Sequence, residues 1–180
     1  MNSERLWAPW RLQYVAGDKS QDPPPEPSAW IPNADHDCFL CRAAAHFEAD
    51  SEADRQLLVV ARRASAVVVL NRFPYNNGHL LVSPCRHVGD LRDLSQEENI
   101  ACLELLSQLT VVYRERLSAE GFNIGLNLGR VAGAGVPGHL HWHLVPRWPG
   151  DNNFMPVLAG VRVIPQSLDE LWDLLQGALD

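Results

Sequence analysis

The sequence of 180 residues contains no long uninterrupted apolar run. Its most apolar stretch, LLVVARRASAVVVL at residues 57–70, is broken by Arg62 and Arg63, so no segment is long enough to cross a bilayer. The first residues, MNSERLWAPWRLQYV, lack the apolar core and the small-residue cleavage site of a secretory signal. We therefore expect a cytoplasmic protein that has no membrane partner.

Positive charge is also scarce. The chain has 15 Lys and Arg against 22 Asp and Glu, which gives a formal net charge of −7. Such a chain has no overall positive field to attract nucleic acid, so we expect no nucleic-acid partner, and any bound phosphate must be held by local groups. The length predicts a single domain that spans residues 1–180.

Cysteine is sparse, with four in the whole chain. Two of them, Cys38 and Cys41, form a C-x-x-C pair, which in a reducing compartment indicates metal or redox chemistry rather than a structural disulfide. A tetrahedral zinc ion would need two further nitrogen or sulfur ligands. We favour His87 and His139 among the seven histidines, although spacing alone does not select His87 and a pair of unliganded thiols remains an equal alternative.

The amino-terminal part is divided in two by composition. Residues 17–37 are rich in proline and acidic residues and have no usable hydrophobic period, which is typical of an irregular connector. The preceding arm contains Trp7, Pro9 and Trp10. It is too apolar for a solvated tail, and we expect it to pack onto the domain or onto a partner subunit.

The rest of the chain predicts an α+β fold. Residues 55–63, 65–71 and 78–84 read as an antiparallel meander, and residues 94–121 have the apolar period of one long helix. That helix opens with a possible capping box at Ser95 and Glu98 and should stop at Gly121. Two further strands at 122–129 and 138–148 should form a hairpin around a glycine-rich loop at 129–138, followed by a short strand at 160–165.

A second amphipathic helix is predicted at residues 167–180, with a possible capping box at Ser167 and Glu170. Together these elements predict an antiparallel sheet of about five or more strands, with the long helix packed on it and a helix at the carboxyl end.

Three histidines recur at every second position in GHLHWHLVPRW, residues 138–148. In a strand, His139, His141 and His143 would share one face, opposite a buried apolar face. They span too far to converge on one metal ion without distortion, and structural histidines would not require this alignment beside a glycine loop. A nucleophilic reading fits better, because a neutral imidazole can attack phosphorus when its other nitrogen donates to a carbonyl, while loop N–H groups bind phosphate oxygens.

The HLHWHLVPRW segment resembles the signature of the histidine triad superfamily of nucleotidyl hydrolases and transferases. ERLWAPWRLQYV, DCFLC, NRFPYNNGHLLVSPCRHVGDL and GFNIGLNLG are similar to the branch that contains bacterial diadenosine tetraphosphate phosphorylases. The resemblance spans most of the chain outside residues 17–37. It implies a histidine triad fold, a homodimer, and a nucleotide or dinucleoside polyphosphate substrate.

The resemblance also implies roles for individual residues. His141 matches the histidine that attacks the α-phosphate, and His143 matches the one that contacts phosphate and assists the leaving group. In zinc-containing relatives the first histidine joins a C-x-x-C pair and a further histidine, which supports structural zinc on the residues Cys38, Cys41, His87 and His139.

Substrate contacts are expected from the resemblance at Asn71, Asn127 and Trp148, and Arg147 could balance phosphate charge. One departure stands out, because relatives carry serine or threonine shortly before the triplet, where this chain has Gly135, Val136 and Pro137. Backbone N–H groups near Gly135 would have to replace the hydroxyl, and Pro137 has none to give.

The sequence predicts double displacement, in which His141 displaces a nucleotide and a second acceptor releases the bound nucleotidyl group. Phosphate as acceptor gives ADP and ATP from diadenosine tetraphosphate, and water gives AMP and ATP. Three alternatives stay open: a histidine triad hydrolase, a nucleotide-binding regulator with negligible turnover, and a metalloenzyme that uses the triplet as ligands. No catalytic metal or organic cofactor is expected.

Overall fold

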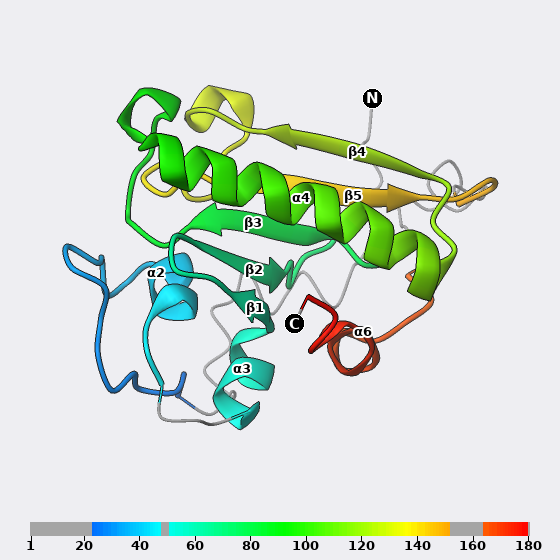
Figure 1. Cartoon of the computed structure of the whole chain (residues 1–180), viewed down its shortest axis with the longest axis horizontal. Coiled ribbons are helices and arrows are strands. Elements are labelled where there is room, and N and C mark those ends of the chain that lie inside the picture. Colours follow the sequence, from blue (N-terminus) through cyan, green and yellow to red (C-terminus); the bar gives the residue numbers. More distant parts are fainter. Residues whose placement is uncertain (1–22, 48–50, 152–163, 180) are drawn as a thin grey trace, which may run out of the picture.

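A computed structural model of the chain describes residues 23–47, 51–151 and 164–179. In these residues one antiparallel sheet has the strand order β1-β2-β3-β5-β4 (Figure 1). The strands are β1 (Val59–Arg62), β2 (Ala66–Leu70), β3 (Leu80–Pro84), β4 (Gly121–Leu126) and β5 (Trp142–Arg147). With the two predicted helices in place, the α+β fold is confirmed.

Strand β5 lies inside the sheet, between β3 and β4. Its residue His143 is paired with Leu81 on one side and with Gly125 on the other. The predicted hairpin of the last two strands is confirmed by the antiparallel pairing of β4 with β5. The register therefore places one histidine of the triplet in the middle of the sheet, where neighbouring strands can supply partners.

Helix α4 (Gln96–Leu117) crosses one face of the sheet (Figure 1) and buries a row of apolar side chains against it. The predicted capping box is confirmed, because the Ser95 hydroxyl accepts from the Glu98 N–H and the Glu98 carboxylate accepts from the Ser95 N–H. The predicted stop at Gly121 is wrong. Ser118 ends the helix in the left-handed conformation, with φ of 52°, and Gly121 already begins β4.

Three short helices lie near the edge of the sheet that is formed by β1: α2 (Phe39–Ala44), α3 (Ser51–Leu57) and α6 (Leu168–Leu175) (Figure 1). The predicted strand at 55–63 is too long, because its first part is helical and Leu58, with φ of 59°, turns the chain into β1. Helix α6 has the predicted capping box but ends at Leu175. The Trp172 indole donates to the Val59 carbonyl at 2.8 Å and fixes α6 on β1.

Two predicted segments lie wholly or mostly outside the described residues, namely the arm before residue 17 and the strand at 160–165. The described part of the connector contains neither helix nor strand, apart from a β-bridge between Ala29 and His46. Arg42 of α2 holds it by donating to the carbonyls of Pro25 and His36. No helix in the described part of the chain is long and apolar enough to span a membrane.

The turn between β2 and β3 depends on Gly78, which has φ of +68°. A Cβ at this position would lie 2.8 Å from Cε1 of Tyr113, whose hydroxyl donates to the Gly78 carbonyl at 2.7 Å. We predict that Gly78→Ala lowers the free energy of unfolding by about 2–4 kcal/mol, because it adds backbone strain and an overpacked contact.

Urea denaturation measures this change. The control is Gly125→Ala, whose added Cβ would meet no atom within 4 Å and whose effect should stay within about 1 kcal/mol. Equal effects of the two substitutions would contradict the role assigned to Gly78.

Candidate active site

The histidine triplet lies where the glycine loop enters β5. The predicted strand at 138–148 is too long, since only Trp142–Arg147 is regular and His139 and His141 precede it in extended chain. The buried Ser83 hydroxyl on β3 donates to the Leu140 carbonyl at 2.9 Å and holds this lead-in segment on the sheet. His139 and His141, on either side of Leu140, are both buried.

The four predicted metal ligands converge. One ligand atom from each of Cys38, Cys41, His87 and His139 lies within 4.8 Å of every other. Nδ1 of His139 is 3.4 Å from both sulfur atoms, and Nδ1 of His87 is 3.2 Å from Sγ of Cys41. When zinc binds sulfur and imidazole nitrogen tetrahedrally at its usual bond lengths, the ligand atoms are about 3.3–3.8 Å apart. The donor set and its spacing therefore fit zinc.

The chemistry of the cluster suits a cation as well. The hydrogen bond with Cys41 and the contact with His139 hold the pKa of the Cys38 thiol well below its usual value, so one thiolate is present at neutral pH. Nε2 of His139 lies 2.9 Å from the Pro84 carbonyl, to which it donates as N–H, so Nδ1 presents a lone pair to the sulfur atoms. Second partners of this kind orient metal-bound histidines.

The glycine loop packs closely against the segment that carries the metal-ligand candidate His87. A Cβ on Gly138 would lie 3.0 Å from Nε2 of His87, and a Cβ on Gly89 would lie 2.6 Å from the Pro137 carbonyl oxygen. The Leu140 N–H donates to the Val88 carbonyl at 2.6 Å. The loop and the segment that carries His87 are therefore packed backbone against backbone.

His141 is held as a potential nucleophile. It is 8 % exposed, and its Nδ1 lies 2.8 Å from the backbone carbonyl of His139. A carbonyl only accepts, so Nδ1 carries the proton and Nε2 keeps its lone pair. Burial lowers the pKa of His141, which favours the neutral ring that nucleophilic attack requires.

The tautomer of His143 is set by a chain of hydrogen bonds that starts at the 72–78 turn. The Tyr75 N–H donates to Nδ1 of His79 at 3.0 Å, so this nitrogen is unprotonated and the neutral ring carries its proton on Nε2. That Nε2–H donates to Nδ1 of His143 at 2.9 Å. The neutral His143 ring therefore bears its proton on Nε2.

Burial keeps both of these rings neutral. It lowers the pKa of His79 to about 3, assisted by the neighbouring His143, and the pKa of His143 to about 4, assisted by His141. The site consequently presents complementary groups at neutral pH: a lone pair on Nε2 of His141 and an N–H donor on Nε2 of His143.

Asn127 lies at the open side of this pair. Its carboxamide is 3.4 Å from Nε2 of His143. Because the two ends of a carboxamide can be exchanged by rotation, the oxygen can accept the His143 proton until a substrate oxygen takes its place. Gly135 lies in the exposed loop, and a Cβ there would meet no atom within 4 Å. The use of loop N–H groups in place of the missing hydroxyl stays a prediction.

The other two predicted substrate residues are placed differently. Asn71 accepts the Phe73 N–H through its oxygen, so its amide nitrogen faces Nδ1 of His79 at 3.2 Å. Trp148 donates its indole N–H to the Leu117 carbonyl, at the end of α4. Within this chain Trp148 is therefore on the α4 side of the sheet, away from His143, and its contact with a nucleotide stays a prediction.

His79 is the functional candidate that sequence reasoning missed. In the sequence it is one histidine in a predicted meander. Its position two residues after two consecutive asparagines, at the entry of a buried strand, offers no chemical signal. Only the pairing of β3 with β5 shows that its ring meets His143.

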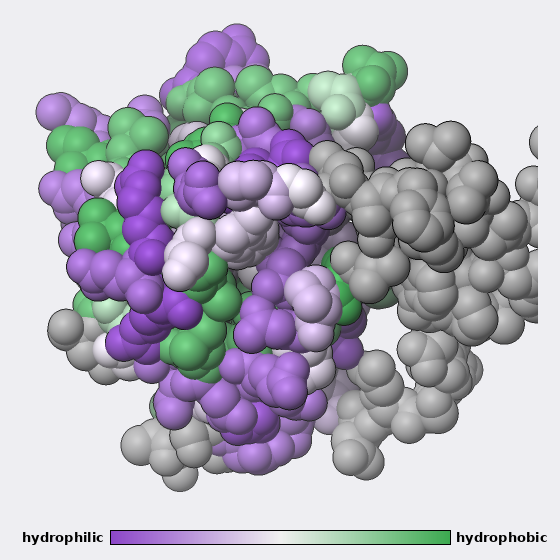
Figure 2. Space-filling view, turned by 90° about the vertical axis from the view of Figure 1, so that its right-hand side faces the viewer, coloured by the Kyte–Doolittle hydropathy of each residue, from purple (hydrophilic) through white to green (hydrophobic). Residues whose placement is uncertain are grey.

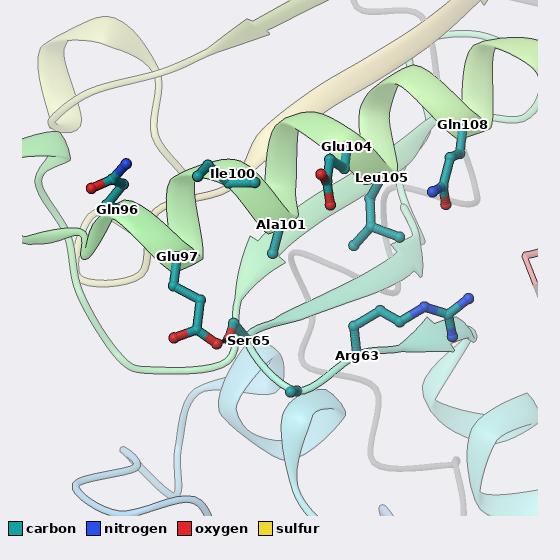
Figure 3. A pocket seen from close by; sticks show the side chains of 10 residues that line it. Arg63, Ser65, Gln96, Glu97, Ile100, Ala101, Glu104, Leu105 and Gln108 are labelled. Carbon is teal, nitrogen blue, oxygen red and sulfur yellow. Dashed lines mark hydrogen bonds between the residues drawn. The ribbon is translucent and has the colours of Figure 1, made fainter.

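A hollow of about 670 Å³ lies elsewhere, between α4 and the turn from β1 to β2 (Figure 3). Arg63 and Gln108 lie at one end, and Ser65 donates to the carboxylate of Glu97 at the other. Among the described residues, its lining contains no histidine or cysteine. The chemistry described above is therefore separate from this hollow.

Comparison with known proteins agrees with this geometry. The HIT domain profile matches residues 52–150, which include β1 to β5 and all three histidines of the triplet. The chain belongs to the HIT family. An AP-4-A phosphorylase from Mycobacterium tuberculosis is 38% identical over 178 residues, which are 96% of this chain and 82% of the relative.

Other members of the family extend the comparison. A bis(5'-nucleosyl)-tetraphosphatase (asymmetrical) from Schizosaccharomyces pombe is 34% identical over 93 residues, which are 52% of this HIT chain and 50% of the relative. The crystal structure of a Zn-bound histidine triad family protein from Mycobacterium smegmatis is 31% identical, with a TM-score of 0.56 over 68% of this chain and 83% of that one. The histidine triad fold is thereby confirmed.

The lowered pKa values make a prediction about stability. Both rings have folded-state pKa values, about 3 and about 4, below the unfolded value of 6.5. Their stabilising contribution is fully present above pH 6.5 and is lost as the pH falls, since the unfolded chain then binds more protons. We predict that His79→Gln flattens the decline of the unfolding free energy between pH 6.5 and 4 by up to about 1.4 kcal/mol per pH unit.

Chemical denaturation at a series of pH values measures this slope. His46→Gln, at an exposed position, controls for the loss of one histidine. An unchanged slope in His79→Gln would show that the His79 ring is not held neutral in the folded protein.

Proposed function

We propose that this chain is a histidine triad nucleotidyltransferase that cleaves dinucleoside polyphosphates through a nucleotidyl-histidine intermediate. The observation that carries the proposal is the pair of fixed ring nitrogens, the lone pair on Nε2 of His141 and the proton on Nε2 of His143. The 38% identical relative named AP-4-A phosphorylase supports this substrate class.

The reaction would proceed in two displacements. Nε2 of His141 attacks the α-phosphorus of diadenosine tetraphosphate, and the bond from that phosphorus to the bridging oxygen breaks. The proton on Nε2 of His143 hydrogen-bonds to the departing oxygen and stabilises its charge. An acceptor then attacks the same phosphorus and frees His141. Phosphate as acceptor yields ADP, and water yields AMP, with ATP as the first product in both cases.

The neighbouring residues would serve this pair. We assign Asn127 to the phosphate oxygens, because its carboxamide lies 3.4 Å from Nε2 of His143. We also assign the loop N–H groups near Gly135 to these oxygens, as the sequence suggests. Asn71 keeps its predicted contact with the nucleoside, from the end of β2. Trp148 lies on the α4 side of the sheet, so its predicted contact would be with a nucleotide held by another subunit.

Product analysis tests the proposed reaction. We predict that diadenosine tetraphosphate with inorganic phosphate yields ADP and ATP, and that His141→Ala lowers the rate at least about 10³-fold because the nucleophile is lost. AMP and ATP regardless of phosphate would identify a hydrolase instead. No turnover by the unaltered protein, together with tight nucleotide binding, would contradict an enzyme and favour a regulator.

We also propose that zinc is held by Cys38, Cys41, His87 and His139 in a structural role. The spacing of the four ligand atoms supports this, and so does the Zn-bound relative from M. smegmatis. All four positions are taken by protein ligands, so no position is left for a catalytic water. Thiolate ligands of this kind fit a cytoplasmic location, where thiols stay reduced.

Metal analysis separates this site from the catalytic one. We predict that Cys38→Ala loses zinc and unfolds at lower temperature, because a ligand is removed from a buried site, whereas His141→Ala keeps one zinc per chain. Zinc content by mass spectrometry and thermal unfolding measure both. Loss of zinc from His141→Ala would favour the triplet as a metal site.

We further propose that the chain forms a homodimer through β4 and the outer face of α4. Strand β4 is an edge of the sheet, and its Ile124 is 46% exposed. The outer face of α4 exposes Ile100, Leu103 and Val111. An edge strand beside apolar side chains is a ready surface for pairing, and a second copy offers the same surface in return.

Light scattering during size-exclusion chromatography tests the dimer. We predict that Leu103→Glu gives a monomer at micromolar concentration, because it places a charge in the apolar contact. Leu91→Glu, which adds the same charge at an exposed site in a different segment, should leave the dimer intact. A dimer that survives Leu103→Glu would exclude this face.

A further inference from the structure

A buried carboxylate lies at the opposite end of β5 from the metal cluster. The side chain of Asp151 is 7% exposed, although it carries a charge. Its two oxygens accept from Nε of Arg147 at 2.6 Å and from a terminal nitrogen of the same guanidinium at 2.9 Å. Arg147, which the sequence suggested for phosphate, is therefore engaged here.

Further donors converge on the same carboxylate. The side-chain amide of Asn76 donates to it at 2.8 Å, and the Trp148 N–H donates at 3.3 Å. The remaining terminal nitrogen of Arg147 donates to Asn123 on β4 at 2.9 Å. These bonds hold the pKa of Asp151 at about 2, first through Arg147, so the carboxylate stays ionised at neutral pH.

Asn76 connects this carboxylate to the 72–78 turn. Its amide nitrogen bridges Asp151 and the Pro146 carbonyl, at 2.8 and 3.1 Å. Its own carbonyl accepts the backbone N–H of His79 at 3.2 Å. The turn is thereby tied to the end of β5 by one side chain, immediately beside the residue that faces His79.

That neighbouring residue is Tyr75, whose N–H donates to Nδ1 of His79 at 3.0 Å and is the shorter of two donors to this nitrogen; the other is the Asn71 amide at 3.2 Å. The Tyr75 ring also lies against both histidines, with centroid distances of 4.7 Å to His79 and 5.7 Å to His143. A turn displaced by about 1 Å would remove the N–H from Nδ1 of His79, since hydrogen bonds weaken steeply with distance and angle.

We propose that Asp151 is a positioning residue for the His79–His143 pair: it anchors Asn76, and the anchored turn holds the Tyr75 N–H on the His79 ring. Asp151 touches neither histidine and acts only through the turn. Its consequence for catalysis rests on the proposed function, whereas its consequence for the ring tautomer does not. Asp151 follows the right-hand end of β5 in Figure 1, and the described residues on that side of the molecule are a mixture of hydrophilic and hydrophobic ones (Figure 2).

A purely structural ion pair is the competing explanation. Arg86 and Glu98 offer the matched control, because Glu98 is also a mostly buried carboxylate that accepts two bonds from one arginine and one from a backbone N–H. It caps α4 and has no link to the 72–78 turn in the described structure. The two carboxylates therefore share their stabilising chemistry and differ in what they hold.

The experiment compares Asp151→Asn with Glu98→Gln in the full-length protein. Each substitution removes one charge and replaces an accepting oxygen with a donor. Long-range ¹H–¹⁵N spectra of the histidine rings report the tautomers without any substrate. We expect Asp151→Asn to convert His79 from the Nε2–H form to a mixture of tautomers, while Glu98→Gln leaves the His79 signals unchanged.

Kinetics give the second readout. We expect Asp151→Asn to lower kcat for diadenosine tetraphosphate about tenfold or more with little change in KM, because the donor on His143 is displaced. Asn76→Ala removes the same hydrogen bond to Asp151 without changing a charge, and it tests the positioning role if Asp151→Asn does not fold.

Unchanged His79 signals in both Asp151→Asn and Asn76→Ala would overturn the proposal, whatever the loss of stability. An altered His79 tautomer without turnover by the unaltered protein would support the positioning role and contradict only the proposed function.

Discussion

The hydrogen bond from Nδ1 of His141 to the His139 carbonyl is the constraint on which the site depends. It leaves the lone pair of His141 on Nε2, where phosphorus can be reached. The carbonyl that accepts it belongs to a residue whose own ring is fixed from two sides, by the cysteine sulfurs and by Pro84. A zinc ion at this cluster would therefore orient the nucleophile through one residue's backbone, without taking part in the chemistry.

The opposite protonation at His143 comes from a different part of the chain. There the Tyr75 N–H helps to fix the tautomer of His79, and the Nε2–H of His79 fixes the tautomer of His143. His141 and His143, two residues apart, thus hold their protons on different nitrogens, because Nδ1 of His141 faces a carbonyl acceptor and Nδ1 of His143 faces the N–H donor of His79. Burial keeps both rings neutral, so neither the nucleophile His141 nor the hydrogen-bond donor His143 needs a pKa near 7.

The sequence predicts the elements whose signals are local. The capping boxes at Ser95 and Ser167 and the alternation of the histidines follow from spacing alone, and the metal ligands follow from a C-x-x-C pair together with a family resemblance. It fails where tertiary contacts decide: Leu58 and Ser118 take left-handed conformations that no propensity favours. His79 is missed because its role exists only through the pairing of β3 with β5.

The ring protonation of the unaltered protein, measured by long-range ¹H–¹⁵N spectra at pH 7, tests the assigned tautomers most directly. We expect a neutral His141 protonated on Nδ1, and neutral His79 and His143 protonated on Nε2. A His141 ring that is protonated on Nε2, or charged at this pH, would contradict this assignment, because no lone pair would then face the phosphorus.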